Sequence, residues 1–507
     1  MSTHPILVTG GTGYVGGRLI PRLLEHGYRV RAMVRSPQRL LARPWGRHEG
    51  LEIAKGDALD TEAFTAAGSG CTAAYYLIHS MNAHKGRFAA ADRKAAQNMV
   101  ACAERNRMER IIYLGGLGEK DDAHLSHHLR SRHEVEGILE SGRVPVTNLR
   151  AAMILGAGSA SFEMLRYLVE RLPVMITPRW LRTPCQPIAI GNVLDYLEGC
   201  LESPATRGRT LDIGGPDVLN YQDLIGIYCT VAGLPRRVVI PVPFLTPWLS
   251  AKWIHLVTPV PASIAQPLAE GLSIPVICRN NDIREMVKVR PVGCEEAIRT
   301  ALERVRQEQV DTCCHDGGGR LPPEWVTCGD ADYAGGTVMR RGYRIVFEGD
   351  PLCLWRTIEA IGGRNGWYFA QSAWRLRGMM DRAAGGPGLA RGRRHSQKLR
   401  VGDTLDMWRV VDRQPPHRLV LLSEMKAPGD ALMEWRVQSG PGSRVTLEMI
   451  SRFLPLGLAG LTYWHVLLPV HDWLFKGTLR RLVHLCGGKE IQGPEIFAVD
   501  TAPQCRL

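Results

Sequence analysis

The sequence predicts an α/β domain built on a doubly wound parallel sheet, followed by a smaller α+β domain. In residues 5–17 an apolar run breaks into glycines, and a helical pattern follows at once. Short apolar strands then alternate with helical segments, which is typical of a parallel sheet covered by helices. Beyond residue 340 the apolar runs read as strands that follow one another. We therefore place the domains at 1–310 and 339–500, joined by a linker at 311–338 that is rich in Gly, Cys, Pro and Asp.

The glycine-rich segment predicts a strand, a tight turn and the start of a helix. Residues 6–8 form the strand, and Gly10, Gly13 and Gly16 follow it. Glycines at such a turn let the backbone approach a pyrophosphate, which the free N–H groups and dipole of the helix N-terminus attract. The sequence therefore predicts a dinucleotide site. We expect the following residues to line it: Gly10, Gly11, Thr12, Gly13, Tyr14, Val15 and Gly16.

The end of the second strand, 28–34, discriminates between the two nicotinamide cofactors. An acidic residue there would accept a hydrogen bond from the ribose 2′-hydroxyl, whereas an arginine accommodates a 2′-phosphate. This chain has Arg35 and Ser36 at the position and no acid. Arg35 therefore favours NADP(H) over NAD(H), and an arginine solvated in a loop is the alternative.

The spacing of Gly10, Gly13 and Gly16 resembles that of the extended and atypical short-chain dehydrogenases, near the NmrA-like proteins and the NAD(P)H-binding accessory subunit of respiratory complex I. The resemblance covers about residues 1–305 and implies a Rossmann-like fold. It also implies that Asp57, followed by Ala58, lies beside the adenine, with an acidic turn residue as the alternative. His79 follows the strand 73–78, whose carboxyl end we expect to face the cofactor.

The chain departs from the active members of that family at the catalytic positions. Those enzymes place a Ser or Thr after the strand that matches 110–114, and a Tyr-x-x-x-Lys on the next helix. Here Gly115 and Gly116 replace the Ser, and the best register puts His128 at the Tyr and Arg132 at the Lys. We expect His128 to act as an acid/base whose pKa the neighbouring Arg132 lowers. The alternative is a polar helix face on which Arg132 contacts the phosphate or ribose of the cofactor.

Thirteen cysteines, an odd number without a repeated spacing, indicate reduced thiols in a cytoplasmic protein. Cys313, Cys314 and His315, with Cys328, lack the Cys-x-x-Cys pair of a zinc site, so we expect no metal. The first strand begins at residue 5, which leaves no room for a signal peptide.

The formal net charge is +13, and the basic residues are densest in one cluster. The cluster consists of Arg391, Arg393, Arg394, His395, Lys398 and Arg400. It has no interleaved aromatic residues and no DNA-binding motif around it. We expect a solvated hairpin or loop there, and no nucleic-acid partner.

The C-terminal domain has an early strand and helix, several antiparallel strands and a final apolar helix, which predicts an α+β helix-grip fold. Residues 361–369, 374–381, 424–428 and 463–464 closely resemble a bacterial domain of unknown function in the START-like (SRPBCC) superfamily. Bacterial proteins that carry this domain behind an atypical short-chain dehydrogenase domain are usually called SDR family or NAD(P)H-binding oxidoreductases.

Seven of the twelve tryptophans lie between Trp355 and Trp473, where they line an apolar cavity or fill the core. The eighteen residues 453–470 contain no charged side chain, and we expect a buried segment of the domain. Two alternatives are a membrane span and peripheral membrane contact. Peripheral membrane contact would use aromatic residues beside basic ones, namely Trp464, Trp473, Phe475, Lys476, Arg480 and Arg481.

The sequence thus predicts a cytoplasmic NADP(H)-binding reductase for an apolar carbonyl or quinone-like molecule, which the C-terminal domain binds. A non-enzymatic NADP(H) sensor or assembly factor is the rival prediction, favoured by the missing Ser and Tyr. The substrate and the oligomeric state stay open.

Overall fold

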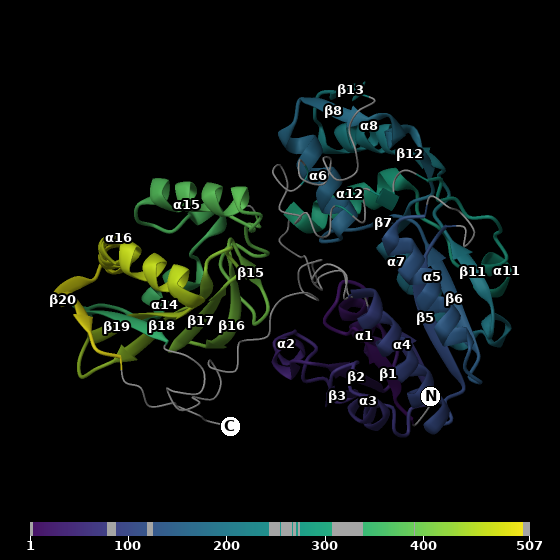
Figure 1. The fold of residues 1–507 in the computed structure, drawn as a ribbon, viewed down its shortest axis with the longest axis horizontal. Helices are drawn as coiled ribbons and strands as arrows, with labels where there is room; N and C mark the ends of the chain where they lie inside the picture. Colours follow the sequence, from purple (N-terminus) through teal and green to yellow (C-terminus); the bar gives the residue numbers. More distant parts are fainter. Residues whose placement is uncertain are drawn as a thin grey trace. The chain divides into compact units, whose positions relative to one another are not determined.

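The computed structural model describes residues 4–78, 88–118, 125–242, 274–306, 338–389 and 391–499, together with four isolated residues between 243 and 273. The chain divides into two compact units, Met1–Gly319 and Arg320–Leu507 (Figure 1). Each unit is described by itself. The predicted linker lies outside the described residues except for residue 338, so its bounds stay a prediction.

The N-terminal unit is built on a seven-stranded sheet in the order β11-β6-β5-β4-β1-β2-β3, and every pairing is parallel. This confirms the predicted doubly wound parallel sheet. The order reverses between β1 and β4, and ligands of such sheets bind at this point, outside the carboxyl ends of the strands. The strands are β1 (Ile6–Thr9), β2 (Val30–Val34), β3 (Leu51–Lys55), β4 (Ala73–Tyr76), β5 (Arg110–Gly116), β6 (Val146–Ala151) and β11 (Thr210–Ile213).

Helices cover both faces of this sheet, because successive strand residues point to opposite sides. Tyr75 packs in a core with α1 and α7, whereas Tyr76 packs in a second core with α3, α4 and α5. These helices are α1 (Gly16–Glu25), α3 (Thr61–Ala67), α4 (Phe88–Arg105), α5 (His127–Glu140) and α7 (Ile190–Glu202), and a short α2 (Pro37–Leu41) follows β2.

The rest of this unit forms a third core beside the sheet. It consists of β7 (Ile154–Leu155), α6 (Ala160–Arg171), β8 (Val174–Pro178), β9 (Pro184–Cys185), β10 (Ile188–Ala189), β12 (Leu219–Asn220), α8 (Tyr221–Ala232), β13 (Val238–Val242) and α12 (Cys294–Arg306), with a 3-10 turn at Arg179–Arg182. Helix α11 (Ile283–Met286) packs instead in the core of α1 and α7, and a second 3-10 turn, Pro204–Thr206, follows α7. The proline-rich segments expected to form a substrate lobe, 240–248 and 257–267, lie mostly outside the described residues.

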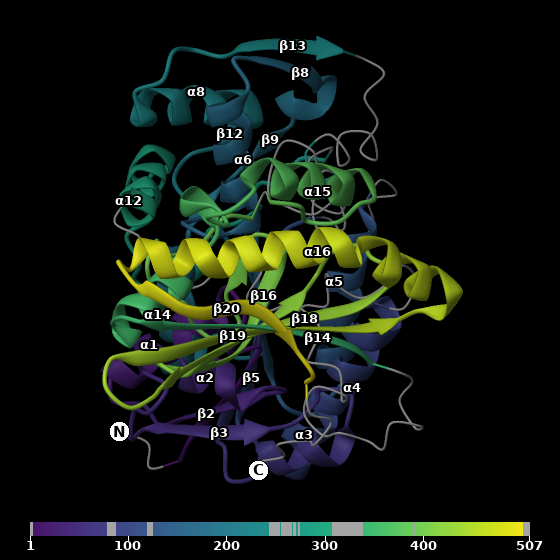
Figure 2. The same ribbon diagram turned by 90° about the vertical axis from the view of Figure 1, so that its left-hand side faces the viewer.

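The C-terminal unit has a seven-stranded antiparallel sheet in the order β15-β16-β17-β18-β19-β14-β20. The long helix α16 (Gly457–Leu485) runs across one face of this sheet (Figure 2). The remaining elements are β14 (Met339–Glu348), α14 (Pro351–Glu359), a 3-10 turn (Gly363–Asn365), α15 (Gln371–Ala383), β15 (Thr404–Leu405), β16 (Trp408–Gln414), β17 (Arg418–Ser423), β18 (Gly429–Ser439), β19 (Arg444–Pro455) and β20 (Lys489–Phe497).

The strands that the apolar runs predict, at 344–347, 408–411, 418–422, 433–437 and 445–449, are all present. The sequence reading missed the two-residue β15 and the longer β20. This edge strand is largely exposed and contains Gly493 and Pro494, a pair that sequence rules read as a break. It pairs with β14 through register shifts, which accommodate the break.

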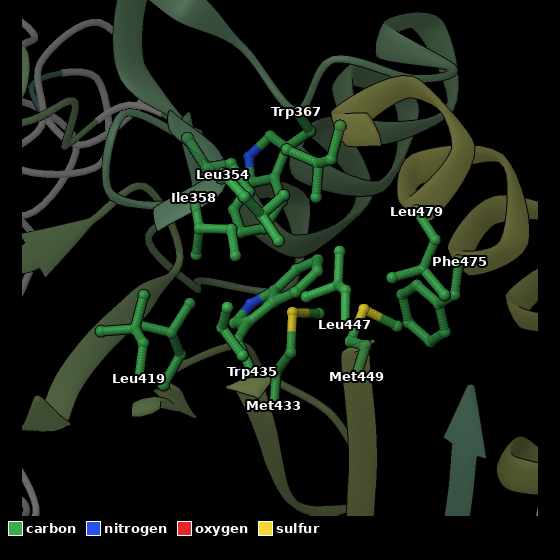
Figure 3. Close-up of a cluster of buried hydrophobic side chains, with 14 of the residues drawn as sticks. Leu354, Ile358, Trp367, Leu419, Met433, Trp435, Leu447, Met449, Phe475 and Leu479 are labelled. Carbon is green, nitrogen blue, oxygen red and sulfur yellow. The ribbon is translucent and has the colours of Figure 1, made fainter. Parts of the chain in front are cut away.

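Tryptophans fill much of the core under α16 (Figure 3). Of the seven tryptophans of this unit that the structure describes, six are buried, and Trp473 is 55% exposed. Trp367 stacks on Trp374 with a centroid distance of 4.5 Å, and its Nε1 donates to Oδ2 of Asp406 at 3.0 Å. The buried carboxylate of Asp406, desolvated in this core, has a pKa raised to about 6.

The uncharged segment 453–470 is not a buried stretch. Phe453 is buried at the end of β19, but α16 begins at Gly457 and exposes Leu461, Val466 and Val470. The expectation of burial is therefore wrong for one side of this helix, which faces away from the sheet. Among the described residues, no helix combines the length and hydrophobicity that a membrane span requires.

The basic cluster is not solvated as expected. Arg391 pairs with Glu424, and Arg394 pairs with Asp403 at 2.9 Å, with all four side chains largely buried. Arg393 donates to the carbonyl oxygens of residues 359 and 361. These arginines hold the loop against its own unit, because each finds an acceptor that the sequence pattern does not reveal.

Candidate functional site

The turn after β1 leaves no room for side chains at its glycines. Gly10 has φ +73°, and a Cβ there would lie 2.5 Å from the carbonyl oxygen of Leu77 on the neighbouring strand connection. The N–H of Gly13 donates to the carbonyl oxygen of Gly10 at 2.9 Å, which closes the turn. A Cβ on Gly16 would lie 2.5 Å from the same oxygen. Only glycine fits at these positions, as the predicted dinucleotide turn requires.

Helix α1 begins at Gly16, and no side chain caps its N-terminus. No side-chain oxygen therefore competes with an anion at this end, and the helix dipole favours negative charge there. The turn is held from the other side by Tyr14 and Arg18: Arg18 lies over the Tyr14 ring at 4.3 Å and donates to the carbonyl oxygen of Ala157 at 2.9 Å. The residues present thus fit the pyrophosphate of a dinucleotide.

Arg35 lies directly after β2, at the carboxyl end of the sheet, and its side chain is exposed. The next strand over is β1, which leads into the glycine turn. The arginine is therefore placed on the side of the turn where a ribose of the bound dinucleotide is expected.

Asp57 and Ala58 follow β3 at the same edge. Oδ1 of Asp57 accepts from the N–H of Leu59 at 3.0 Å, and the carbonyl oxygen of Ala58 accepts from Nδ2 of Asn98 at 2.7 Å. Asp57 thus stabilises its own turn, as expected for an acidic turn residue. Its carboxylate is exposed at the edge of the sheet where an adenine would lie. His79 lies outside the described residues.

The absence of a Ser at the end of β5 has a packing cause. A Cβ on Gly116 would lie 2.6 Å from Cδ2 of Leu129, a buried residue of α5. A Ser at this position would therefore require the Leu129 side chain to move.

His128 and Arg132 lie on one face of α5, four residues apart, as expected from the sequence. Burial and then the charge of Arg132 lower the pKa of His128 to about 3, although part of its surface remains exposed. At pH 7 roughly one molecule in 10⁴ would carry a protonated His128. The imidazole is therefore neutral near pH 7, which suits a hydrogen-bonding role better than proton donation from an imidazolium.

Arg132 is buried and paired with a carboxylate. Its Nη2 lies 2.9 Å from Oδ2 of Asp92 on α4, and Nη1 donates to the carbonyl oxygen of Ile78 at 3.4 Å. The guanidinium therefore lies at the carboxyl end of β4, beside the point between β1 and β4 where the strand order reverses. Ser131 also donates to the Asp92 carboxylate at 3.3 Å.

A pocket of about 240 Å³ lies at the carboxyl ends of β5, β6 and β11. It is lined by Leu117, Gly118, Arg150, Asp212, Pro275, Ile277, Cys278 and Arg279. Within it Arg150 and Asp212, register partners on β6 and β11, form an ion pair of 2.8 Å. Oδ2 of Asp212 also accepts from the N–H of Arg279 at 3.0 Å, which fixes the far wall.

Comparison with known families agrees with the geometry of the turn. Residues 10–160 match a family model described as NAD(P)H-binding. The N-terminal unit contains an NAD(P)H-binding domain. Residues 334–478 match a second model, described as a protein of unknown function (DUF2867), which does not identify the fold as START-like.

Relatives of this NAD(P)H-binding domain include several reductases. A dihydroflavonol 4-reductase from Hordeum vulgare is 32% identical over 130 residues, which are 22% of this chain and 35% of the relative. A Synechocystis sp. protein named after dihydroflavonol 4-reductase is 24% identical over 303 residues, 53% of this chain and 82% of the relative. A 3 beta-hydroxysteroid dehydrogenase/Delta 5-->4-isomerase from Mycobacterium tuberculosis is 30% identical over 117 residues, 21% of this chain and 30% of the relative. This chain therefore spans about a third of the length of the first and last of these relatives.

Solved structures with a similar chain course include nicotinamide-binding proteins. An NADPH-dependent quinone oxidoreductase from Escherichia coli, complexed with NADPH, has a TM-score of 0.47 and 17% identity, and the match covers 58% of this chain and 98% of the other. The Citrobacter sp. triphenylmethane reductase complexed with NADP(H) has a TM-score of 0.48 and 18% identity, covering 58% of this chain and 99% of the other. Bordetella bronchiseptica WbmG in complex with NAD has a TM-score of 0.48 and 15% identity, covering 62% and 97%.

Several residues of the site escaped the sequence reading. Asp92 and Asn98 are polar residues of the amphipathic helix α4. Only the structure shows that Asp92 pairs with Arg132 and that Asn98 donates to the carbonyl oxygen of Ala58. Arg150 and Asp212 pair across β6 and β11, and this pairing depends on a register that the sequence does not give. For Arg150 and Asp212, the signal available in the sequence was a charged residue inside an apolar run.

Proposed function

We propose that this protein is an NADP(H)-dependent reductase that acts on an apolar carbonyl or quinone-like molecule, and that its C-terminal unit binds an apolar ligand. The observation that carries the proposal is the tight turn after β1, in which Gly10 and Gly16 have no room for a Cβ, next to a helix N-terminus that no side chain caps. The similarity to reductases supports the class of reaction.

The preference for NADP(H) rests on Arg35, an exposed cation after β2 with no acid beside it at the strand end. A guanidinium at this place would contact a 2′-phosphate. When bound, the reduced cofactor would supply a hydride to the substrate. The chain itself would bind the pyrophosphate at α1, and Arg132, held by Asp92, would keep a positive charge beside the switch point.

His128 remains the proposed acid/base residue at the family's tyrosine position. Since its pKa is lowered to about 3, it would act as a neutral imidazole that donates a hydrogen bond to the substrate oxygen.

An assay of NADPH oxidation tests the enzyme hypothesis. The full-length chain is incubated with NADPH and a panel of aromatic aldehydes, ketones and quinones, and the loss of absorbance at the reduced-nicotinamide band is followed. Turnover that requires both the panel compound and the protein supports the reductase. Tight NADPH binding without turnover on any compound would favour the rival, a non-enzymatic NADP(H) sensor or assembly factor.

One observation favours that rival. Gly116 stands in place of the usual Ser, and the neutral His128 stands in place of the usual Tyr. A protein that only senses NADP(H) needs neither group.

For the C-terminal unit we propose a helix-grip, START-like fold with an apolar ligand. The antiparallel sheet and the long α16 over one face support it. Four buried indole N–H groups have no acceptor among the described residues, and a buried donor without an acceptor destabilises a fold by about 1–3 kcal/mol. A ligand carbonyl in this core would remove that cost. The four belong to Trp355, Trp374, Trp408 and Trp435.

We further propose a cytoplasmic location with peripheral membrane contact through α16. Its outward side exposes Leu461, Val466, Val470 and Trp473, and Arg480 and Arg481 follow one to two turns later. Apolar residues beside basic ones are typical of helices that lie in the headgroup region of a membrane.

A further inference from the structure

Two strands of the N-terminal unit, β8 and β13, pair with each other outside the main sheet, at the end of the unit far from β3 (Figure 1). They run parallel, and residues 174 and 176 of β8 pair with residues 238 and 240 of β13. Successive residues of a strand point to opposite faces, whereas directly paired residues share a face. One face carries Met175 and Val239, which pack in the third core with residues of α6 and α8. The two register pairs lie on the other face.

This second face is apolar and exposed to solvent. Its four side chains are aliphatic and between 45% and 57% exposed, and we call them the β8–β13 face. They are Val174, Ile176, Val238 and Ile240. Parallel strands are normally covered on both faces, and a strand with one solvated face normally alternates apolar with polar residues. The β8–β13 pair follows neither rule, because both of its faces are apolar and one of them is exposed.

Arginines flank the β8–β13 face in the sequence, without any acidic residue among them. Residues 171–189 and 233–242 contain the two strands and their flanks, with five arginines and no Asp or Glu. The five are Arg171, Arg179, Arg182, Arg236 and Arg237. The nearest acid in the sequence, Glu170, already accepts from the hydroxyl of Tyr228 at 2.8 Å. Arg236 precedes β13 and Arg182 follows β8, so an exposed cation lies near each end of the face.

The charges argue against a second copy of this chain as the occupant of the face. A two-fold interface places the same surface on both subunits, so arginines would lie opposite arginines with no carboxylate between them. Pairing with a further strand is disfavoured at the β13 edge, because a proline there, Pro241, blunts the edge. Protein interfaces also depend on aromatic anchors, whereas the four residues of the face are all aliphatic.

A membrane surface fits both the apolar face and the arginines. Aliphatic side chains beside basic ones are typical of elements that lie at the boundary between lipid headgroups and acyl chains. Anionic headgroups attract arginines near the surface. We propose that the β8–β13 face docks on a membrane that contains anionic phospholipid, with its aliphatic side chains at the acyl boundary and the flanking arginines at the lipid phosphates. This surface belongs to the N-terminal unit and is separate from α16, and the proposal does not depend on cofactor binding or on reductase activity.

Co-sedimentation of the full-length chain with vesicles tests the proposal. One set of vesicles contains phosphatidylcholine and phosphatidylglycerol, and the other contains phosphatidylcholine alone. We expect tighter binding to the first set, and a loss of that advantage as the salt concentration rises. Equal binding to both sets, or binding to neither, would overturn the proposal.

Two isoleucines of the face provide the sharpest variant. Burying a fully exposed Ile side chain corresponds to roughly 10- to 150-fold in a partition coefficient, and Ile176 and Ile240 are each about half exposed. We therefore expect Ile176→Ser/Ile240→Ser to lower the partition coefficient onto anionic vesicles at least about tenfold. The matched control, Leu41→Ser/Val218→Ser, changes two residues outside the face that are 46% and 50% exposed, and should bind like the native protein.

The same variant separates this surface from its competitors. If the folded Ile176→Ser/Ile240→Ser variant binds vesicles like its control while Trp473→Ser does not, α16 makes the contact and the proposal is wrong. Sedimentation velocity tests the second copy: a native dimer that Ile176→Ser/Ile240→Ser dissociates would assign the face to self-association instead.

The arginines have their own variant and control. Arg182→Gln/Arg236→Gln should weaken binding to anionic vesicles by roughly fivefold for each arginine removed and leave binding to neutral vesicles unchanged. Arg47→Gln/Arg143→Gln, which changes two exposed arginines elsewhere in the unit, should have a smaller effect. Equal losses in the two variants would contradict a specific role of the flanking arginines.

Hydrogen exchange on the native protein covers the case in which a variant does not fold. Anionic vesicles are expected to slow amide exchange in peptides that cover residues 171–178 and 236–242, and to leave exchange in α2 unchanged. Exchange in the two strand peptides that is the same with and without vesicles would overturn the proposal.

Discussion

The guanidinium of Arg132 and the carboxylate of Asp92 form a buried ion pair in which Nη2 lies 2.9 Å from Oδ2. The pair ties α5 to α4 and fixes a positive charge at the carboxyl end of β4. Because both side chains are almost fully buried, neither charge can be left alone without a large cost.

Removing one partner should therefore destabilise the N-terminal unit. We expect Asp92→Asn to lower the free energy of unfolding by about 3–5 kcal/mol, the usual cost of leaving a buried charge unpaired. Urea titration followed by circular dichroism measures it. Glu134→Gln breaks an exposed pair with Arg93 and should cost at most about 1 kcal/mol. Equal losses in both variants would show that the Asp92 pair is not buried in solution.

Cofactor preference should depend on Arg35. We expect the native protein to bind NADPH more tightly than NADH by roughly 10- to 150-fold, and Arg35→Asp to reverse the order. Calorimetric titrations with both cofactors measure the ratio. Arg47→Asp, which changes another exposed arginine of this domain, is the control and should keep the native order. Equal affinities of the native protein for both cofactors would remove Arg35 from the site.

His128 should make the fold sensitive to acid. Its pKa is lowered to about 3 from an ordinary value near 6.5, so the unfolded chain binds a proton that the folded chain rejects. Above pH 6.5 His128 is neutral in both states and does not lower the stability of the fold. As the pH falls from 6.5 toward 3, the unfolded chain gains a proton at His128 and the free energy of unfolding decreases. We therefore expect the native protein to lose more stability than His128→Phe between pH 7 and pH 4. Parallel stability curves for the two proteins would contradict the assigned environment.

The outward side of α16 predicts membrane contact. Vesicles that contain anionic phospholipid should carry the native protein upward in a flotation gradient, and vesicles of neutral lipid should carry less of it. Replacing Trp473 with Ser removes the most exposed aromatic residue of the helix and should reduce flotation. The control, Ser203→Ala, changes a residue of the other unit. Native protein that stays with the soluble fraction in both gradients would argue against contact.

The sequence predicted the parallel sheet and the glycine turn because both depend on local patterns. Apolar runs define the strands, and Gly10, Gly13 and Gly16 define the turn without reference to distant residues. Most strands of the C-terminal unit were predictable for the same reason. The exceptions are β15, which has only two residues, and β20, whose Gly493 and Pro494 break the local pattern.

Residues that depend on long-range contacts could not be predicted in this way. The arginines of the basic cluster look solvated in the sequence, but their acceptors come from other strands and loops of the same unit.

The most direct test of the central claim is an NADPH titration of the full-length chain. The account predicts that the native protein binds NADPH and that Gly16→Ala weakens binding at least about tenfold, because a Cβ there would collide with the carbonyl oxygen of Gly10 and deform the turn. Gly226→Ala, in α8, adds a methyl group with nothing within 4 Å and should bind like the native protein. A folded Gly16→Ala variant with native NADPH affinity, or a native protein that binds no NADPH, would contradict the claim.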